Sequence, residues 1–443
     1  MTQHPDSNVV EALTLLTDSP IEPVELATPG PRPRKLSEMG VRETTLEDIA
    51  LKALYLTGPF SVLDLAEKMC VGFEVATELM NRLRGKLLCE VTGMSVNVPN
   101  IAITSQGRSR ALELLSQSQY SGAAPVSLAS YVELVRKQSV RNLTVGPKEV
   151  EKAFAHMVFE PKTLAQFGTA LNSGAPIFLY GPPGVGKTAA AETMSRVVSG
   201  DEVWVPHAVE IDGQIITIFD PVIHRKRPAS GGIETDTRWV FCHRPTVIVG
   251  GELTIDMLDL QFNQSTRFYV GPPQMKANNG VLIIDDFGRQ RILPEELLNR
   301  WVVPLDRRVE FLTLAGGRKI EVPFEMLVVF ASNLDPTRVM DPAFLRRIQT
   351  KIHIGAVKDE HFHEIFRRVA EEHHVEVRKE LVDDVIDFIK NTLKQGLRSC
   401  YPRDLMNQMV WAARYEGREL KIDRDSLTRA VDSYFVPKVE MSE

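Results

Sequence analysis

Cysteine and long apolar runs are scarce in this chain of 443 residues, and both absences narrow the class of protein. The four cysteines, Cys70, Cys89, Cys242 and Cys400, stand far apart without a Cys-x-x-Cys pair, which favours buried thiols in a reducing compartment over disulfides or a zinc framework. No uninterrupted apolar run approaches the roughly 18 residues of a membrane span, and the first residues lack the charged start and apolar core of a signal peptide. The sequence therefore predicts a cytoplasmic protein that neither spans a membrane nor is secreted.

An excess of charge of one sign is also missing. Charged residues make up 25% of the chain and hydrophobic residues 43%, with a formal net charge of -6. This balance gives no global attraction to nucleic acid or to an anionic membrane. A basic protein that coats DNA is therefore not expected, and about three folding units are expected at roughly 150 residues each.

Aromatic residues are absent from residues 1–45, which include the proline-rich stretch TPGPRPRKL. A segment of this composition buries too little apolar area to offset the entropy lost on ordering. We therefore expect a disordered tail that ends where helical periodicity begins.

Helical periodicity dominates residues 46–118, with two strand-like pieces before the last helical segment. Three helices, a two-stranded wing and a closing helix resemble a winged-helix domain, whose third helix commonly reads DNA. Here the segment carries seven basic and eight acidic residues, and Glu74, Glu78 and Arg82 follow one another at i, i+4 and i+8 on the third helix. Because a phosphate-binding surface normally shows a basic stripe, we favour a solvated or protein-docking face over a DNA-binding face.

The stretch YGPPGVGKT combines three glycines with one lysine directly after the apolar run APIFLY. Residues 181–188 match G-x-x-x-x-G-K-[ST], and the alanine-rich stretch that follows predicts a helix. Strand, glycine-rich loop and helix are the context of a P-loop, in which backbone N–H groups and the helix N-terminus bind phosphate oxygens. Lys187 is predicted to reach the β- and γ-phosphates of ATP, and the Thr188 hydroxyl to bind Mg²⁺. The predicted ATP-binding residues are Gly181, Pro182, Pro183, Gly184, Val185, Gly186, Lys187, Thr188 and Ala189.

Two carboxylates follow a second apolar run, in GVLIIDDFGRQ. This order after a P-loop is typical of a Walker B strand, predicted at residues 281–284. Asp285 is expected to hold Mg²⁺ through water, and Asp286 lies where a carboxylate that activates water is needed. Many ATPases have glutamate at the second position, and aspartate is shorter by one methylene. Asp286 therefore leaves open whether hydrolysis is rapid or slow.

Later motifs extend the pattern to a resemblance to the AAA+ ATPases. The apolar run in MLVVFASNLDP ends at Asn333, which matches the sensor 1 position, where a polar side chain orients water. The segment DPAFLRRIQTKIHIG resembles the one that carries the arginine finger, with Arg347 as first choice and Arg346 as second. Arg403, near the start of the helix expected in YPRDLMNQMVWAARYEGREL, matches the sensor 2 position. The resemblance implies a homo-oligomeric ring, most often a hexamer, in which an arginine of one subunit reaches the nucleotide of its neighbour.

The resemblance covers roughly residues 149–435 and implies two domains. Residues 149–355 are expected to form an α/β nucleotide-binding domain, a P-loop parallel sheet with covering helices whose strands lie in APIFLY, VWVPHAVEI, GVLIIDD, MLVVFASN and KIHIG. Residues 356–437 are expected to form a lid of four amphipathic helices. Residues 119–148, which begin with small and polar residues, are predicted to be a linker, and the long stretch before the Walker B strand is predicted to be an insertion.

The motifs predict an ATP hydrolase that binds Mg-ATP at subunit interfaces and couples hydrolysis to the remodelling of a protein partner. Two alternatives stay open. One is an ATPase that assists a DNA transaction through the winged-helix-like domain, and the acidic balance of that domain weighs against it. The other is a nucleotide-dependent scaffold with little hydrolysis, which Asp286 keeps open.

Overall fold

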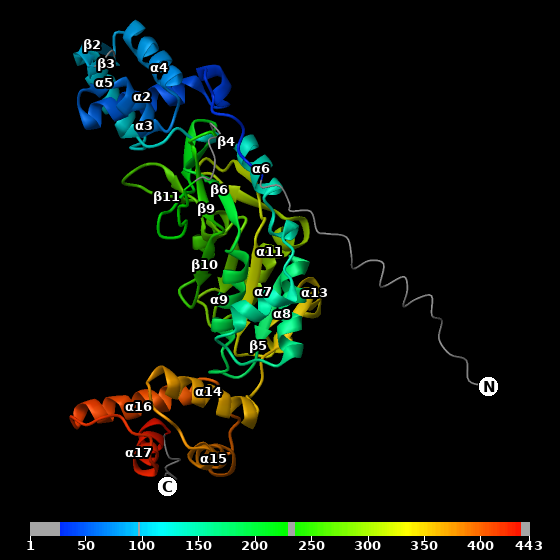
Figure 1. Ribbon diagram of the computed structural model, residues 1–443. Helices are drawn as coiled ribbons and strands as arrows, with labels where there is room; N and C mark the ends of the chain where they lie inside the picture. Colours follow the sequence, from blue (N-terminus) through cyan, green and yellow to red (C-terminus); the bar gives the residue numbers. More distant parts are fainter. Residues whose placement is uncertain (1–26, 96–97, 229–234, 436–443) are drawn as a thin grey trace, which may run out of the picture.

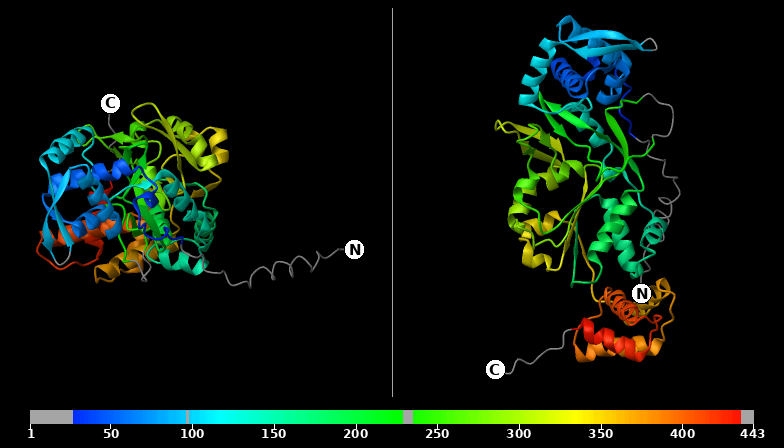
Figure 2. Two further views of the ribbon diagram at one scale, coloured as in Figure 1. Left: turned by 90° about the horizontal axis from the view of Figure 1, so that it is seen from above. Right: turned by 90° about the vertical axis from the view of Figure 1, so that its left-hand side faces the viewer.

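The computed structural model describes residues 27–95, 98–228 and 235–435, so most of the expected tail lies outside the described residues. The described chain is elongated (Figure 1). The N-terminal helical domain forms one end, a β-rich module and an α/β core form the middle, and the helical lid forms the other end (Figures 1 and 2). Among these residues, no helix has both the length and the apolar character that a membrane crossing requires.

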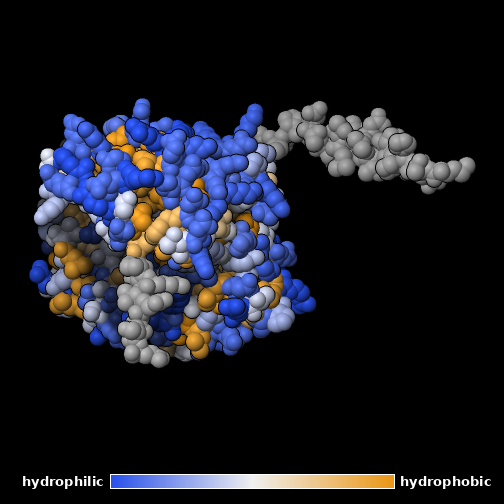
Figure 3. Space-filling view, turned by 90° about the horizontal axis from the view of Figure 1, so that it is seen from below, coloured by the Kyte–Doolittle hydropathy of each residue, from blue (hydrophilic) through white to orange (hydrophobic). Residues whose placement is uncertain are grey.

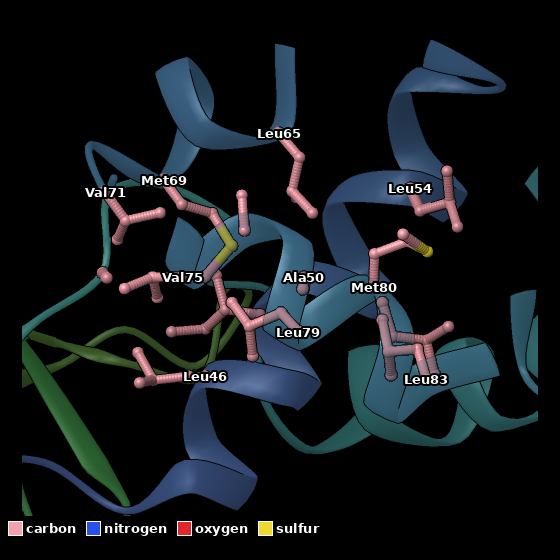
Figure 4. Packing of buried hydrophobic residues seen from close by; sticks show 14 of the residues in the cluster. Leu46, Ala50, Leu54, Leu65, Met69, Val71, Val75, Leu79, Met80 and Leu83 are labelled. Atoms are coloured by element: carbon pink, nitrogen blue, oxygen red, sulfur yellow. The ribbon is translucent and has the colours of Figure 1, made fainter. Parts of the chain in front are cut away.

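The N-terminal domain packs helices and a small antiparallel sheet around one core. Its elements are α2 (Glu43–Thr57), β1 (Phe60–Ser61), α3 (Val62–Met69), α4 (Phe73–Gly85), β2 (Cys89–Ser95), β3 (Val98–Ile103) and α5 (Ser105–Gln117). Apolar side chains recur at helical spacing on α2, at Leu46, Ala50 and Leu54, and lie against Leu65 of α3 and Leu79 of α4 (Figure 4). The helices and the β2–β3 hairpin follow one another in the predicted order, while β1, which the sequence analysis did not predict, adds a third strand to the sheet.

This domain begins earlier than the sequence indicates. A short 3-10 helix, η1 (Leu36–Met39), precedes α2, and Leu36 and Met39 are buried in the domain core. The N–H of Leu36 donates to a carboxylate oxygen of Glu78 at 2.9 Å, and Glu78 lies 3.5 Å from Arg82. The face of α4 that carries Glu78 and Arg82, which the sequence suggested to be exposed, is therefore partly covered by the segment just before α2.

A β-rich module lies between the N-terminal domain and the α/β core (Figure 1). One sheet has the strand order β11-β12-β8-β7-β4, and two antiparallel pairs, β6-β9 and β14-β15, complete the module. The strands are β4 (Val126–Ser127), β6 (Glu202–Pro206), β7 (Ala208–Ile211), β8 (Gln214–Thr217), β9 (Trp239–His243), β11 (Gln261–Phe262), β12 (Tyr269–Val270), β14 (Val309–Thr313) and β15 (Lys319–Pro323). They share a hydrophobic core that includes Trp204, Phe241, Tyr269 and Leu312. Segments far apart in sequence therefore form one packed unit.

Residues 119–148, predicted to be a linker, are largely built into this module. They contain β4, which pairs in parallel with β7, and the helices α6 (Leu128–Lys137) and η2 (Val140–Asn142). Ser127 caps α6 by accepting a hydrogen bond from the N–H of Ser130 at 3.1 Å, and Tyr131 is buried in the module core. The small residues that suggest a flexible linker instead permit close packing.

A buried arginine joins the N-terminal domain to the β-rich module. The guanidinium of Arg238 donates to the carbonyl oxygens of Met39 at 2.8 Å and Pro125 at 3.0 Å, and pairs with Asp236 at 2.7 Å. Both charged side chains are nearly inaccessible to water. Because an unpaired buried charge is costly, these bonds hold the two units in a defined arrangement.

The α/β core contains a five-stranded parallel sheet with the order β10-β13-β16-β5-β17. Its strands are β5 (Ile177–Tyr180), β10 (Thr246–Val249), β13 (Val281–Ile284), β16 (Leu327–Ser332) and β17 (Thr350–His353). One face is covered by α7 (Pro147–Phe154), α8 (Pro161–Ser173) and α9 (Lys187–Val198), and the other by α11 (Pro294–Arg307) and α13 (Pro342–Arg347). The predicted α/β fold with a parallel sheet and covering helices is confirmed.

The prediction that VWVPHAVEI forms a strand of this sheet is wrong. The run VWVPHAVEI divides at His207 into β6 and β7, and both halves pair within the β-rich module. Strand β10, in TVIV, takes the edge position beside β13 instead. Both runs are short and apolar, so local pattern does not distinguish which of them joins the parallel sheet. The insertion consequently lies on both sides of β10.

The predicted helical lid forms the C-terminal end of the described chain (Figure 1). Its helices are α14 (Asp359–Glu372), α15 (Lys379–Asp387), which continues into the π-helical turn η4 (Phe388–Thr392), α16 (Tyr401–Tyr415) and α17 (Arg424–Tyr434). They enclose a separate core that includes Phe362, Phe366, Leu405 and Met409. Viewed from the lid end, the surface is mainly hydrophilic with scattered apolar residues (Figure 3).

At Gly280, two chain segments approach each other closely at the start of the parallel sheet. A β-carbon at residue 280 would lie 1.9 Å from the carbonyl oxygen of Pro245, a backbone atom that cannot move aside freely. We expect Gly280→Ala to destabilise the chain by more than about 1 kcal/mol, measured as a lower urea midpoint of unfolding. The control is Gly85→Ala, whose β-carbon meets nothing within 4 Å. Equal midpoints for the two variants would contradict this packing.

A buried carboxyl on β14 makes stability depend on pH. Glu310 is 3% exposed, and its oxygens accept no hydrogen bond of good geometry from the described residues, although Arg300 Nη2 lies 3.2 Å away. Burial raises the pKa of Glu310 to about 7. Between its usual pKa, about 4.3, and this value, the unfolded chain loses the proton that the folded chain keeps, so this group makes stability fall as pH rises through that window.

We therefore expect Glu310→Gln to gain stability relative to wild type between pH 5 and pH 8. The gain should approach about 1.4 kcal/mol for each unit of pKa difference that the substitution removes. Urea unfolding of both proteins at the two pH values measures it. A difference in stability that is the same at pH 5 and pH 8 would contradict the assignment.

Candidate nucleotide site

The loop between β5 and α9 has glycine at three positions where the backbone conformation disfavours any other residue. Gly181, Gly184 and Gly186 have φ angles of +147°, +78° and +93°, which side-chain-bearing residues rarely adopt. A β-carbon at residue 181 would lie 2.0 Å from the carbonyl oxygen of Ile354, just after β17. The loop is therefore pressed against the end of the neighbouring strand.

Backbone N–H groups of this loop are available to an anion. Those of Gly184, Val185 and Gly186 donate to no carbonyl or side chain in the part of the chain that the structure describes. Helix α9 begins directly afterwards at Lys187, so its unpaired first-turn N–H groups and its positive dipole end lie at the same place. This geometry suits phosphate oxygens.

Lys187 lies along the loop and reaches the next strand. Its Nζ donates to the carbonyl oxygens of Gly181 at 3.1 Å and Pro182 at 2.8 Å, and to Oδ1 of Asn333 at 2.7 Å. Burial lowers the pKa of Lys187, and the charge of Asp285 opposes that shift. The side chain is a buried cation held at the mouth of the loop.

Thr188 and Asp285 supply oxygen atoms of the kind that Mg²⁺ prefers. The Thr188 hydroxyl donates to Asp285, with 2.9 Å to Oδ1 and 3.1 Å to Oδ2. Asp285 follows β13 directly, and its carbonyl oxygen accepts a hydrogen bond from the Gln290 side chain at 2.8 Å. The donor set and its support fit a hydrated Mg²⁺ ion, which commonly takes one or two carboxylates and a hydroxyl.

Asp286 and Asn333 form the next contact along the edge of the sheet. Asn333 Nδ2 donates to Asp286 Oδ1 at 2.9 Å, while Asn333 Oδ1 accepts from Lys187. Asp286 has φ 49°, a left-handed conformation that places its side chain at this edge. Lys187, Asn333 and Asp286 are therefore linked in one chain of hydrogen bonds.

These groups line a cleft of about 1060 Å³ between the α/β core and the lid. The predicted residues that line it are Pro183, Gly184, Val185, Gly186, Lys187, Thr188, Ala189, Asp285, Asp286, Asn333 and Arg403. Its apolar part is lined by Val158, Phe159, Ile354, Val357 and Ile365. A polar end beside an apolar end fits the phosphates and the base of a nucleotide.

The arginines predicted from the resemblance have different positions. Arg403 is exposed on α16 and lines the cleft. Arg347 donates to Asp306 at 2.9 Å and lies over the ring of Phe344, and Arg346 is exposed and forms no ion pair with any described residue. Neither Arg346 nor Arg347 lines the cleft of its own chain.

Sequence motifs did not reveal the residues that join the lid to the core around this cleft. Arg368 of α14 donates to the carbonyl oxygen of Ala155 at 2.7 Å, and Lys358 pairs with Glu160 at 2.7 Å. Ser399 contacts the loop at Gly184. These residues belong to no motif and are brought together only by folding.

The order of the strands decides what kind of P-loop core this is. Strand β16, which ends before Asn333, lies between the P-loop strand β5 and the Walker B strand β13. The P-loop, both carboxylates and Asn333 therefore meet at one edge, with a helical lid beyond it. The core has the fold of the AAA+ P-loop ATPases.

Comparisons with known proteins find only distant likenesses. A family described as "Domain of unknown function (DUF8689)" matches residues 358–433, within the lid, and no curated protein matches the chain. A mutant of RuvB from Thermotoga maritima is 13% identical over 67% of this chain and 72% of its own, with a TM-score of 0.36. NtrX from Brucella abortus in complex with ADP is 12% identical over 75% of this chain and 68% of its own, with a TM-score of 0.38. Such similarity carries no argument about activity, which rests on the residues of the site.

Lys187 provides the direct test of nucleotide binding at this site. We expect Lys187→Ala to weaken Mg-ATP binding at least about tenfold, because a charge-assisted contact to phosphate is lost. Isothermal titration calorimetry measures the affinity, and thermal unfolding shows that the variant is folded. Lys162→Ala, at an exposed position on α8, is the control and should bind as wild type. Unchanged affinity in Lys187→Ala would contradict the site.

Proposed function

We propose that the chain is an ATP hydrolase that binds Mg-ATP in this cleft. The observation that carries the proposal is the meeting of Lys187, Thr188, Asp285, Asp286 and Asn333 at the phosphate end of one cleft. Each residue type has a matching task in phosphoryl transfer, where positioning and charge neutralisation supply most of the catalysis.

The loop and Lys187 hold the phosphates. Loop N–H groups bind phosphate oxygens, and the Lys187 ammonium neutralises charge on the β- and γ-phosphates. Thr188 and Asp285 would hold Mg²⁺, which supplies further charge neutralisation when bound. Arg403 lines the cleft from the lid and can add a positive charge there.

Asp286 is the proposed residue that orients the attacking water. Its Oδ1 accepts from Asn333, and its Oδ2 accepts no hydrogen bond from the described residues. The free oxygen can accept a proton from water aligned with the γ-phosphate, while Asn333 fixes the carboxylate plane.

We propose that the site is completed by a second copy of the chain. Arg346 and Arg347 lie away from the cleft of their own chain, so a role in hydrolysis requires the cleft of a neighbour. A homo-oligomeric ring, most often of six subunits in the family that the sequence resembles, would bring them there. Arg347 is the first candidate and Arg346 the second.

The proposed output is remodelling of a protein partner in the cytoplasm, with the N-terminal domain as the docking unit. Binding of DNA by this domain is not favoured, because its acidic residues outnumber its basic ones. The proposed domains are a winged-helix-like unit, expected at 46–118 and extended by η1 on its N-terminal side, a nucleotide-binding domain expected at 149–355, which also carries most strands of the β-rich module, and the lid expected at 356–437. Electrophoretic mobility of a DNA duplex with the full chain tests the alternative, which tight, salt-dependent binding would favour.

The catalytic arginine is tested by hydrolysis rate as a function of protein concentration. We expect the rate per chain to rise as light scattering shows assembly, and Arg347→Ala to lower it at least about tenfold while Mg-ATP still binds. The variant should fold, because a partly exposed ion pair such as Arg347 with Asp306 contributes at most about 1 kcal/mol. Arg414→Ala, exposed on α16, is the control.

Two outcomes would count against this account. A rate per chain that is independent of concentration and unchanged in both Arg347→Ala and Arg346→Ala would contradict the intersubunit role. Tight Mg-ATP binding with background hydrolysis in the assembled wild type, no different from Asp286→Asn, would favour the scaffold alternative.

A further inference from the structure

A turn of the lid binds the P-loop at a single carbonyl oxygen. The Ser399 hydroxyl and the N–H of Cys400 both donate to the carbonyl oxygen of Gly184, each at 3.1 Å. Ser399 and Cys400 immediately precede α16, whose first turn carries Arg403 into the cleft. The lid and the phosphate-binding loop are thus joined inside the site.

The contact is tight as well as polar. Gly184 has φ +78°, and a β-carbon there would lie 2.7 Å from Cys400 Sγ and 3.3 Å from Cδ of Arg398. A β-carbon on Gly186 would lie 3.5 Å from the Ser399 hydroxyl oxygen. The distance at Gly186 is an ordinary contact, so Gly184 is the position where the loop approaches the turn closely because it presents bare backbone.

Peptide geometry connects this contact to phosphate binding. In a planar trans peptide, the carbonyl and the following N–H point in opposite directions. The carbonyl of Gly184 points to Ser399 and Cys400 of the lid, so the N–H of Val185 in the same peptide points away from that turn. That N–H has no partner among the described residues, and Val185 lines the cleft.

We infer that Ser399 is a positioning residue that orients the Gly184–Val185 peptide so that its N–H faces the phosphates of the nucleotide. The inference rests on the proposed nucleotide site and adds a residue that no motif contains. Ser399 acts through the loop backbone and not by touching the reacting atoms. Through the same two hydrogen bonds, phosphate binding and lid position are coupled.

The rest of the lid contact does not depend on Ser399. Arg368 still holds the carbonyl of Ala155, and Lys358 still pairs with Glu160. Loss of one hydroxyl should therefore leave the lid attached and the fold intact. Substitution of Ser399 therefore distinguishes an effect on the Gly184–Val185 peptide from a general loosening of the lid.

The test compares Mg-ATP and adenosine binding to wild type, Ser399→Ala and Ser399→Thr in the full chain. We expect Ser399→Ala to weaken Mg-ATP binding about threefold to tenfold, the effect of one hydrogen bond, with an unchanged unfolding temperature. Adenosine, which has no phosphate, should compete for the cleft with the same affinity in all three proteins. Ser399→Thr keeps a hydroxyl and should restore Mg-ATP binding. Ser433→Ala, a serine on α17, is the matched control.

Each result bears on a distinct claim. Equal Mg-ATP affinity in wild type and Ser399→Ala overturns the positioning role and leaves the proposed function standing. Equal losses for Mg-ATP and adenosine also overturn it, because they indicate a loosened lid. A wild type that binds neither ligand overturns the proposed function and the inference together.

Discussion

The register of three parallel strands decides which side chains meet at the edge of the sheet. Tyr180 pairs with Ser332, and Phe330 pairs with Ile284, so β5, β16 and β13 end within a residue or two of one another. The next residues along each strand are the P-loop glycine, Asn333 and the two carboxylates. Because a register shift by one residue would turn Asn333 and the two carboxylates to the other face and displace the loop that begins at Gly181, the whole site depends on this pairing.

Burial of Lys187 makes this edge of the sheet favour an anionic ligand. Lys187 is nearly inaccessible, and its ammonium is held by two loop carbonyls and Asn333. A buried cation without an anion is costly, which is why its pKa is lowered and why a polyphosphate is a fitting partner. The loop can approach the strands and the lid so closely because it carries no β-carbons at the points of contact.

Motifs located the residues that line the cleft better than sequence patterns located the strands of the fold. The P-loop and the Walker B strand carry their own local geometry, so their residues could be assigned from the sequence. Strand β10 and the run that divides at His207 are both short and apolar, and only non-local pairing distinguishes them. The supposed linker at 119–148 shows the same limit, because small residues suit both a mobile chain and close packing.

Contacts between the lid and the loop could not be predicted from the sequence, for a different reason. Ser399 is an ordinary polar residue in a turn, and nothing near it in sequence indicates that it reaches Gly184, more than two hundred residues earlier. The buried Arg238 likewise joins two units only through backbone carbonyls that surround it after folding. Such residues determine how the units fit together, and their types alone do not reveal this.

The most direct measurement is a crystal structure of the Asp286→Asn variant grown with Mg-ATP. We expect the triphosphate to lie against the N–H groups of residues 184–186, with Lys187 turned to the β- and γ-phosphates and the metal beside Thr188 and Asp285. A nucleotide bound elsewhere, or a cleft that stays closed to ATP at saturating concentration, would contradict it.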